Sequence, residues 1–278
     1  MIVGIYSNPE RDVNLFVTKK LIDLLRREDV DFLVHETLKK HIDGVDYFSN
    51  NKKTDVVIAL GGDGTILSAV NFSAEKNTPV LGINLGQLGF LSECTADRLE
   101  ECVLRLKKGD YFLSKRSMLE TVINNRRLIA LNEIVFYKPN IGRTVTLSVN
   151  VGGSNIGCFK GDGYMVSTPT GSTGYALSSG GPVMSPHVKC NLLVPLNCHQ
   201  LSLKPIVIND DEVVEIISNE PSCVIADGVV HEELTRKIIV KKSQTEAMFI
   251  SLEKTNFYKR MNYKLNGGII KEVECSGT

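Results

Sequence analysis

The stretch V-V-I-A-L-G-G-D-G-T, residues 56–65, decides the fold of the first half of this chain. Residues 56–60 form a short, continuous apolar run, which is typical of a strand that is covered on both faces. Residues 66–74 then place apolar side chains at helical spacing. The stretch therefore predicts a buried strand that passes through a glycine-rich turn into a helix.

The same alternation of strand and helix continues on both sides of this stretch. Strands are predicted over residues 2–6, 30–34 and 80–83, and helices over about 15–25 and 96–108. Lys107, Lys108 and Gly109 provide the basic residues and the glycine that favour a helix end. We therefore predict an α/β N-terminal domain over residues 1–110, with a parallel sheet flanked by helices.

The pattern changes near Tyr111, because β-type runs dominate from there on. Hairpins are predicted around residues 124–127 and 152–154. Further strands are predicted over 213–217, 223–226, 237–240 and 247–252. We expect a mainly β C-terminal domain over residues 111–254, and a short helix over 257–265 within a segment, 255–278, that returns to the first domain.

Length and composition limit the classes of protein. The chain has 278 residues, which suits two domains, and its 42% hydrophobic and 23% charged residues exclude wholesale disorder. Lys plus Arg total 32 and Asp plus Glu total 32, so no overall field attracts nucleic acid or an anionic membrane. No apolar run reaches membrane-spanning length, and residues 1–7 do not read as a signal peptide.

The seven cysteines indicate a reducing compartment. Their number is odd, they are widely spread, and no Cys-x-x-Cys occurs. We therefore expect a cytoplasmic protein with reduced, buried thiols. Cys198 and His199 are adjacent but lack partners at metal-ligand spacing, which favours core residues over a zinc site. The cysteines are Cys94, Cys102, Cys158, Cys190, Cys198, Cys223 and Cys275.

The glycine-rich turn at residues 61–65 is suited to phosphate binding. Glycine allows close approach of a phosphate, and the following helix offers free N–H groups and the positive end of its dipole. Asp63 is unusual there unless it accepts a hydroxyl proton or holds a metal that bridges to phosphate. No Lys follows, as a Walker A motif requires, and Leu67 replaces the third glycine of the dinucleotide fingerprint. The alternative is a tight turn in which Asp63 caps the helix.

A second polar segment lies in the β-rich half. From Thr168 to Gly174 every residue is hydroxylated, glycine or proline, and Tyr175 follows. Hydroxyls and exposed N–H groups suit a binding loop, in which Tyr175 would stack on a base. The alternative is an irregular surface loop, and we favour the binding loop because loops carry sites disproportionately.

Together these motifs resemble the NAD kinase family. The resemblance covers most of the chain, and the hydroxyl-rich segment is its most specific part. It rests on G-G-D-G-T at 61–65, N-L-G-x-L-G-F at 84–90, Asn132-Glu133, G-D-G at 161–163, S-T-G-Y at 172–175 and G-G-P at 180–182. It implies transfer of the γ-phosphoryl group of ATP to the 2′-hydroxyl of the adenosine ribose of NAD, with Mg²⁺ neutralising phosphate charge.

The resemblance also implies roles for individual residues. Asp63 would accept the hydroxyl proton, and Gly61, Gly62 and Thr65 would border the phosphates. NAD would be bound by Asp63, Gly64, Asn132, Glu133, Arg143, Lys160, Asp162, Thr173, Gly174, Tyr175 and Ser178. The alternatives are a polar turn for Asn132 and Glu133 and a solvated strand face for Arg143 and Lys160. No metal ligand is assigned, and the resemblance implies a homodimer or homotetramer.

The sequence departs from the family pattern at four positions. Gly174 stands where alanine is usual, and Lys160 stands where arginine is frequent. Gln87 replaces a commonly basic residue, and Val229 follows Asp227-Gly228 where glutamine is common. We therefore assign no contact to Val229.

Two other functions remain open at this point. A lipid kinase shares the glycine-rich turn but needs an apolar acceptor pocket or a membrane-binding surface. A non-catalytic dinucleotide-binding protein has little need of a carboxylate beside phosphates, so Asp63 distinguishes it from a kinase.

Overall fold

The structure is a computed structural model that describes residues 1–49, 53–140, 142–200, 202–254 and 257–265. The chain divides into two compact units. Unit 1 comprises Met1–Ser114 and Met248–Thr278, and unit 2 comprises Lys115–Ala247. Cys275 and the rest of 266–278, part of the segment expected to return to the first domain, lie outside the described residues.

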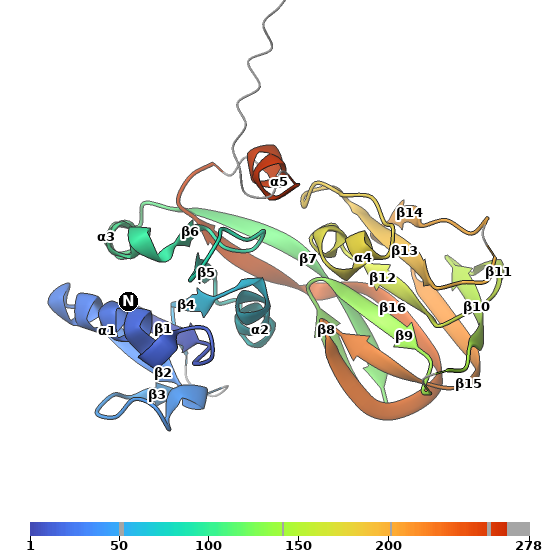
Figure 1. The fold of residues 1–278 in the computed structure, drawn as a ribbon, viewed down its shortest axis with the longest axis horizontal. Helices are drawn as coiled ribbons and strands as arrows, with labels where there is room; N and C mark the ends of the chain where they lie inside the picture. The colour runs from blue at the N-terminus through green and yellow to red at the C-terminus, as the bar shows by residue number, and fades with distance from the viewer. Residues whose placement is uncertain (50–52, 141, 201, 255–256, 266–278) are drawn as a thin grey trace, which may run out of the picture. The chain divides into compact units, whose positions relative to one another are not determined.

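Unit 1 is an α/β unit with a parallel sheet, which confirms the predicted fold class of the first half (Figure 1). The strand order is β5-β4-β1-β2-β3, and every one of these pairs is parallel. The strands are β1 (Ile2–Ser7), β2 (Asp31–His35), β3 (Tyr47–Phe48), β4 (Val56–Gly61), β5 (Val80–Asn84) and β6 (Cys94–Thr95), which pairs with β5. All six residues of β4 are buried, as its continuous apolar run predicts.

Helices cover this sheet. Its α-helices are α1 (Phe16–Arg27), α2 (Asp63–Ala74), α3 (Leu99–Lys108) and α5 (Phe257–Leu265), and the shorter turns are η1 (Val13–Leu15), η2 (Glu36–Leu38) and η3 (Ala96–Arg98). Leu21 and Leu25 of α1 share one core cluster with Val103 and Leu106 of α3 and with the sheet. Helix α2 contacts β4 and β5. The helix predicted over 96–108 is therefore a short η3 turn that continues as α3.

Unit 2 is mainly β, as predicted for the second half. Its strands are β7 (Phe112–Ile123), which starts in unit 1, β8 (Arg126–Ala130), β9 (Glu133–Tyr137), β10 (Val145–Val151), β11 (Ser154–Gly161), β12 (Gly163–Ser167), β13 (Cys190–Leu196), β14 (Ile206–Asn209), β15 (Val214–Ala226) and β16 (Val229–Ser251). The pairs among β9, β12, β13, β14 and β15 are antiparallel. Its core includes Phe136, Tyr164, Val166, Leu193 and Ile216.

Three hairpins of this unit turn on two residues with positive φ. These turns are Asn124-Asn125, Gly152-Gly153 and Asp227-Gly228. Two positive φ values match the twist of paired strands, which is why Asn, Asp and Gly occupy these positions. The two predicted hairpins are confirmed, and the third joins β15 to β16.

The prediction of four separate strands after residue 213 is wrong. Residues 214–217 and 223–226 belong to one strand, β15, and residues 237–240 and 247–251 belong to β16, whereas Val213 and Leu252 lie outside these strands. Register shifts between Ile217, Ser222 and Val224 interrupt the alternation of side chains, so the sequence pattern looks broken where the strand continues. Within unit 1, Phe249 of β16 pairs in parallel with Val80 of β5, so the second unit ends before residue 254.

The hydroxyl-rich segment is more regular than predicted. It forms a single 3-10 turn, η4 (Gly171–Thr173), and one short helix, α4 (Tyr175–Ser178). In the described part of the chain, none of the helices has the length and apolarity that a membrane crossing requires.

Candidate functional site

The glycine-rich turn joins β4 directly to α2. Gly62 is the N-cap residue in an extended conformation, and Asp63 is the first helical residue. A Cβ at Gly61 would overlap the side chain of Thr65, so only glycine allows Thr65 to lie over the end of the strand. The alternative in which Asp63 caps the helix is wrong, because its side chain bonds elsewhere.

The Asp63 carboxylate accepts two backbone hydrogen bonds from the segment that follows β5. The N–H of Phe90 donates to Oδ2 at 2.8 Å, and the N–H of Leu91 donates to Oδ1 at 3.2 Å. Gly89 makes this approach possible, since a Cβ there would overlap Oδ1. The fold thus fixes the orientation of a carboxylate at the N-terminus of a 12-residue helix.

A pocket of about 510 Å³ lies beside this turn. It is lined by Tyr6, Ser7, Asn8, Pro9, Arg11, Gly62, Asp63, Gly64, Thr65 and Ser68. It lies at the carboxyl ends of β1 and β4. On one side of this point the sheet continues with β2 and β3, and on the other side with β5, so it is the topological switch point of the sheet. Open α/β sheets bind ligands at such switch points.

Two features suit this pocket to an anion. Arg11 supplies a positive charge, and helix α2 points the positive end of its dipole toward the pocket. Ser7 is 3% exposed, and its Oγ has no hydrogen-bond partner among the described residues. An unsatisfied buried hydroxyl is costly unless a ligand or water completes it.

Sequence reasoning missed the contribution of β1 to this pocket. None of the site residues predicted from the sequence lies in residues 1–12. The strand order would have revealed it, because the carboxyl end of β1 reaches the glycine-rich turn only if β1 lies next to β4. Periodicity in the sequence does not contain that order.

In unit 2, Asn132 and Glu133 lie where β9 begins, and Asp227 holds their backbone. One Asp227 oxygen accepts the N–H of Leu131 at 2.7 Å. The other accepts the N–H groups of Asn132 at 2.7 Å and Glu133 at 3.2 Å. Asp227 also donates its own N–H to the carbonyl of Glu133 at 3.1 Å. Asp227 therefore holds the backbone of this candidate site in place. The sequence showed Asp227 only as part of the Asp227-Gly228 motif.

The Glu133 carboxyl group is buried, and one of its oxygens has no hydrogen-bond partner in the described structure. Its side chain is 7% exposed, and Oε2 has no hydrogen-bond partner within the described ranges. Burial and the nearby charge of Asp227 raise the pKa of Glu133 to about 8. The carboxyl group is therefore mostly neutral at pH 7 and can both donate and accept a hydrogen bond.

The hydroxyl-rich segment packs directly on Asn132. Thr168 Oγ1 donates to the carbonyl of Leu131 at 2.6 Å, and Ser172 Oγ accepts the N–H of Met184 at 2.9 Å. Both hydroxyls are buried. The interpretation that the whole segment offers its hydroxyls to a ligand is therefore wrong for Thr168 and Ser172, which hold the fold.

Gly174 and Tyr175 extend this cluster. A Cβ at Gly174 would lie 3.7 Å from Asn132 Nδ2 and 3.8 Å from Glu133 Oε2, so the three residues are neighbours. Tyr175 is 45% exposed. Burial, then the negative charges of nearby groups that include Asp162 and Glu133, raise its pKa. The structure therefore brings together Asn132, Glu133, Gly174 and Tyr175.

The other predicted residues of unit 2 lie in different environments. Asp162 is ion-paired with Lys138 at 2.6 Å and accepts a hydrogen bond from Asn197 at 2.9 Å. Burial acts to raise the pKa of Asp162, but these two partners outweigh it and lower the pKa. Arg143 and Lys160 are exposed and make no side-chain ion pair within the described part of the chain. Thr173 is half-buried and Ser178 is exposed.

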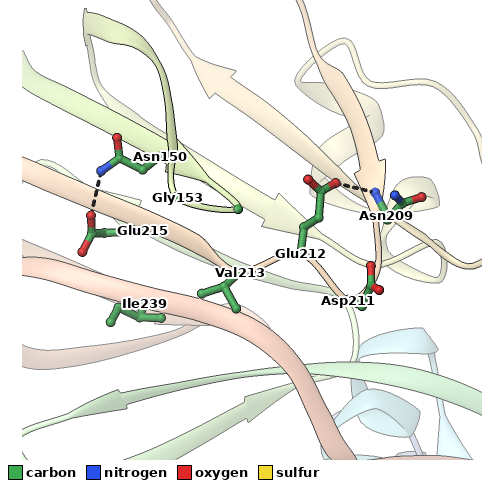
Figure 2. A pocket seen from close by; sticks show the side chains of 9 residues that line it. Asn150, Gly153, Asn209, Asp211, Glu212, Val213, Glu215 and Ile239 are labelled. Atoms are coloured by element: carbon green, nitrogen blue, oxygen red, sulfur yellow. Dashed lines mark hydrogen bonds between the residues drawn. The ribbon is translucent and has the colours of Figure 1, made fainter.

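A larger pocket of unit 2, about 650 Å³, contains none of the predicted residues (Figure 2). It is acidic, but two of its three carboxylates, Glu212 and Glu215, already have partners. Glu215 accepts a hydrogen bond from Asn150 at 2.7 Å and pairs with Lys237, and Glu212 accepts the N–H of Asn209 at 3.0 Å. We therefore do not consider it a candidate site.

Comparisons with known proteins agree with the division of the chain into two units. The family model described as the ATP-NAD kinase N-terminal domain matches residues 3–111, and that of the ATP-NAD kinase C-terminal domain matches residues 131–252. The chain is 34% identical to the NAD kinase of Natranaerobius thermophilus, over 96% of this chain and 98% of the relative. It is 33% identical to the NAD kinase of Methanopyrus kandleri, over 95% and 96%.

Two solved structures share the fold. The yeast NADH kinase in complex with NADH superposes with a TM-score of 0.86 at 22% identity, covering 98% of this chain and 89% of that one. The Archaeoglobus fulgidus NAD kinase in complex with ATP gives a TM-score of 0.77 at 24% identity, covering 96% and 99%.

Proposed function

This chain belongs to the NAD kinase family, and from that membership we propose that it transfers the γ-phosphoryl group of ATP to the 2′-hydroxyl of the adenosine ribose of NAD, giving NADP. The observation that carries the proposal is the position of Asp63, an oriented carboxylate inside an anion-binding pocket. A lipid kinase is not favoured, because both halves match the models of NAD kinases.

The pocket beside α2 would bind the phosphates of ATP. Gly61, Gly62 and Thr65 would border them, since glycines and the helix N-terminus leave backbone N–H groups free for phosphate oxygens. Arg11 would neutralise part of their charge, and Ser7 Oγ would gain the partner that it lacks.

The cluster in unit 2 would bind NAD. Asn132 and the unpartnered Glu133 Oε2 would hydrogen-bond the dinucleotide, and the half-exposed ring of Tyr175 would stack on a base. Gly174 would leave room for the ligand next to Glu133. The same proposal assigns NAD contacts to Gly64, Arg143, Lys160, Asp162, Thr173 and Ser178, as well as to Asp63.

Asp63 would act as the proton acceptor. As the 2′-oxygen bonds to the γ-phosphorus, the bond from that phosphorus to the leaving oxygen of ADP breaks and the hydroxyl proton moves to the Asp63 carboxylate. The two N–H donors fix the carboxylate and keep its remaining lone pairs in one direction. Orientation of this kind is a large part of catalysis, because little covalent chemistry falls to the protein.

A divalent metal ion belongs to the same proposal. Mg²⁺ usually binds through substrate phosphates and one or two carboxylates, so it needs no dedicated protein cage. The described residues contain no group of three or more His, Cys, Asp or Glu side chains that could hold a metal. The phosphates of ATP would therefore carry the ion, which neutralises charge on the phosphoryl group when bound, and we assign it no protein ligand.

A homodimer or homotetramer and a cytoplasmic location complete the proposal. Free thiols support a reducing compartment, and six of the cysteines are unpaired in the described structure.

The test is an end-point assay with ATP, Mg²⁺ and NAD, in which an NADP-specific dehydrogenase detects the product. We expect NADP from the wild-type protein and a loss of about 10²- to 10⁴-fold in turnover for Asp63→Asn, the usual range for a general base. Asp43→Asn, which changes an exposed carboxylate of unit 1, should leave turnover unchanged. Absence of NADP from folded wild-type protein would contradict the proposal, and full turnover by Asp63→Asn would remove Asp63 as the base.

A further inference from the structure

Residues 89–93, which we call the 89–93 loop, are the last part of the connection from β5 to β6 and hold Asp63. The backbone N–H groups of this loop donate hydrogen bonds to other residues of unit 1. The N–H of Gly89 donates to Ser92 Oγ at 2.7 Å, which closes the loop, and the N–H of Glu93 donates to the carbonyl of Gly82 at 2.7 Å. The N–H groups of Phe90 and Leu91 donate to Asp63. The position of Asp63 therefore depends on the position of this loop.

Arg260, on helix α5, binds the same loop from the opposite end of the sequence. Its Nη1 donates to the carbonyl of Ser92 at 2.7 Å and to that of Phe90 at 3.3 Å. Its Nη2 forms an ion pair with Glu93 Oε2 at 3.1 Å. One guanidinium group thus bonds three points of the 89–93 loop, which its planar arrangement of five donors makes possible.

The contact with Phe90 connects Arg260 to Asp63 through a single peptide group. The carbonyl of Phe90 and the N–H of Leu91 belong to the same peptide unit. Arg260 binds the carbonyl side of that unit, and Asp63 Oδ1 accepts its N–H side at 3.2 Å. A cation at the carbonyl polarises the peptide and strengthens the hydrogen bond that its N–H donates to a carboxylate.

Burial and additional bonds keep this connection in place. The side chains of Arg260 and Glu93 are 14% and 10% exposed, so solvent screens the pair little. Glu93 also accepts the N–H of Leu252 at 2.9 Å and the hydroxyl of Ser251 at 2.8 Å. The end of β16, helix α5 and the 89–93 loop therefore meet at Glu93.

We propose that Arg260 is a positioning residue for phosphoryl transfer, which orients Asp63 through the 90–91 peptide and the 89–93 loop. The proposal rests on the proposed role of Asp63 as the proton acceptor. It assigns a function to the C-terminal helix, which carries none of the motifs on which the family resemblance rests.

The test compares Arg260→Gln, Arg260→Lys and the control Lys264→Gln in the full chain. Lys264 lies in the last turn of the same helix, so its substitution removes the same charge without touching the loop. We expect Arg260→Gln to lower kcat by about 10- to 100-fold, the effect of misplacing a catalytic group by about 1 Å. The KM values for NAD and ATP should stay within about twofold, since Arg260 contacts neither proposed ligand site.

The conservative variant separates positioning from simple loss of structure. Arg260→Lys keeps the charge and bonds to fewer carbonyls, so we expect a kcat between those of Arg260→Gln and the wild type. Unchanged kcat in Arg260→Gln, or a loss of activity that follows only the fall in thermal midpoint, would overturn the proposal. If Arg260→Gln does not fold, Arg260→Lys decides: a kcat equal to that of Lys264→Gln would overturn the proposal.

The failure of the proposed function would look different. In that case the wild type and Lys264→Gln would make no NADP either. If the wild type makes NADP, Asp63→Asn does not, and Arg260→Gln is fully active, the function stands and only the role of Arg260 fails.

Discussion

Glu133 and Asp227 place two carboxyl groups beside the backbone of residues 131–133, and their different surroundings give them different protonation states. Asp227 accepts three backbone N–H groups, which satisfy its charge. Glu133 is 7% exposed, lacks a described partner at Oε2, and faces that charge. Burial and Asp227 therefore raise the pKa of Glu133 to about 8, so its neutral form predominates at pH 7.

This arrangement predicts a pH-dependent cost to stability. The pKa of Glu133 in the folded protein, about 8, exceeds its ordinary value of 4.5. The contribution of this group to the free energy of unfolding is therefore fully present below pH 4.5 and is lost as the pH rises through 8. Glu133→Gln cannot ionise. We expect its free energy of unfolding to exceed that of the wild type by a margin that grows from pH 5 to pH 8.5, on the order of a few kcal/mol.

Urea denaturation of both proteins at several pH values measures this margin. The control is Glu10→Gln, which changes an exposed carboxylate of unit 1. Its free energy of unfolding should run parallel to that of the wild type across the range. A constant margin for Glu133→Gln would show that Glu133 ionises in the folded protein as it does in water.

At the scale of elements, the candidate residues lie in short connections between strands and helices. Hydrogen bonds to polar groups hold each of these connections in place. The glycine-rich turn between β4 and α2 contacts the 89–93 loop between β5 and β6, and both follow neighbouring parallel strands. In unit 2, the hydroxyls of the segment around η4 bond to the backbone that precedes β9. In each unit, the candidate residues therefore lie in loops that the sheet of that unit positions.

The 89–93 loop predicts a steric test. A Cβ at Gly89 would overlap Asp63 Oδ1, so Gly89→Ala must displace either the loop or the carboxylate. We expect about a 100-fold loss of kcat in the NADP assay, because a displaced carboxylate no longer lies in line with its proton. The variant should remain folded, with a thermal midpoint close to that of the wild type.

Gly86→Ala is the matched control in the same connection. A Cβ there would meet only Asn84 Oδ1 at 3.8 Å, which is an ordinary contact. Its kcat should equal that of the wild type. Equal activities of Gly89→Ala and Gly86→Ala would show that the fit between Gly89 and Asp63 does not matter for turnover.

At the scale of the whole molecule, the two units supply different halves of the proposed chemistry. The strand order of unit 1 places the proposed phosphate pocket and Asp63 at the switch point of a parallel sheet. Unit 2 supplies a buried, partly unsatisfied polar cluster on an antiparallel framework. Binding of NAD and turnover should therefore be separable by substitution.

Ligand-induced stabilisation measures that separation. A ligand at about 100 times its Kd raises the free energy of unfolding by about 2.7 kcal/mol. We expect NAD to raise the thermal midpoint of Asp63→Asn nearly as much as that of the wild type, although this variant makes little NADP. Loss of the shift would place Asp63 mainly in binding. A shift in both proteins with no NADP from the wild type would favour a non-catalytic dinucleotide-binding protein.

The sequence by itself determined the local structure and the family. Continuous apolar runs, helical spacing and glycine-rich turns predicted β4, α2 and the hairpins, because these features depend on residues that are close in the chain. The order of the motifs predicted the family, and Asp63, Asn132, Glu133, Gly174 and Tyr175 are candidate site residues because of it.

Only the tertiary structure decided how these residues are held. Phe90 contacts Asp63 across 27 residues, Asp227 contacts Leu131 across 96, and Arg260 contacts Ser92 across 168. Such contacts follow from strand order and from the packing of distant segments, and local periodicity contains neither. The same reason explains why the sequence did not reveal that β1 lines the proposed phosphate pocket, and why Thr168 and Ser172 form hydrogen bonds within the fold.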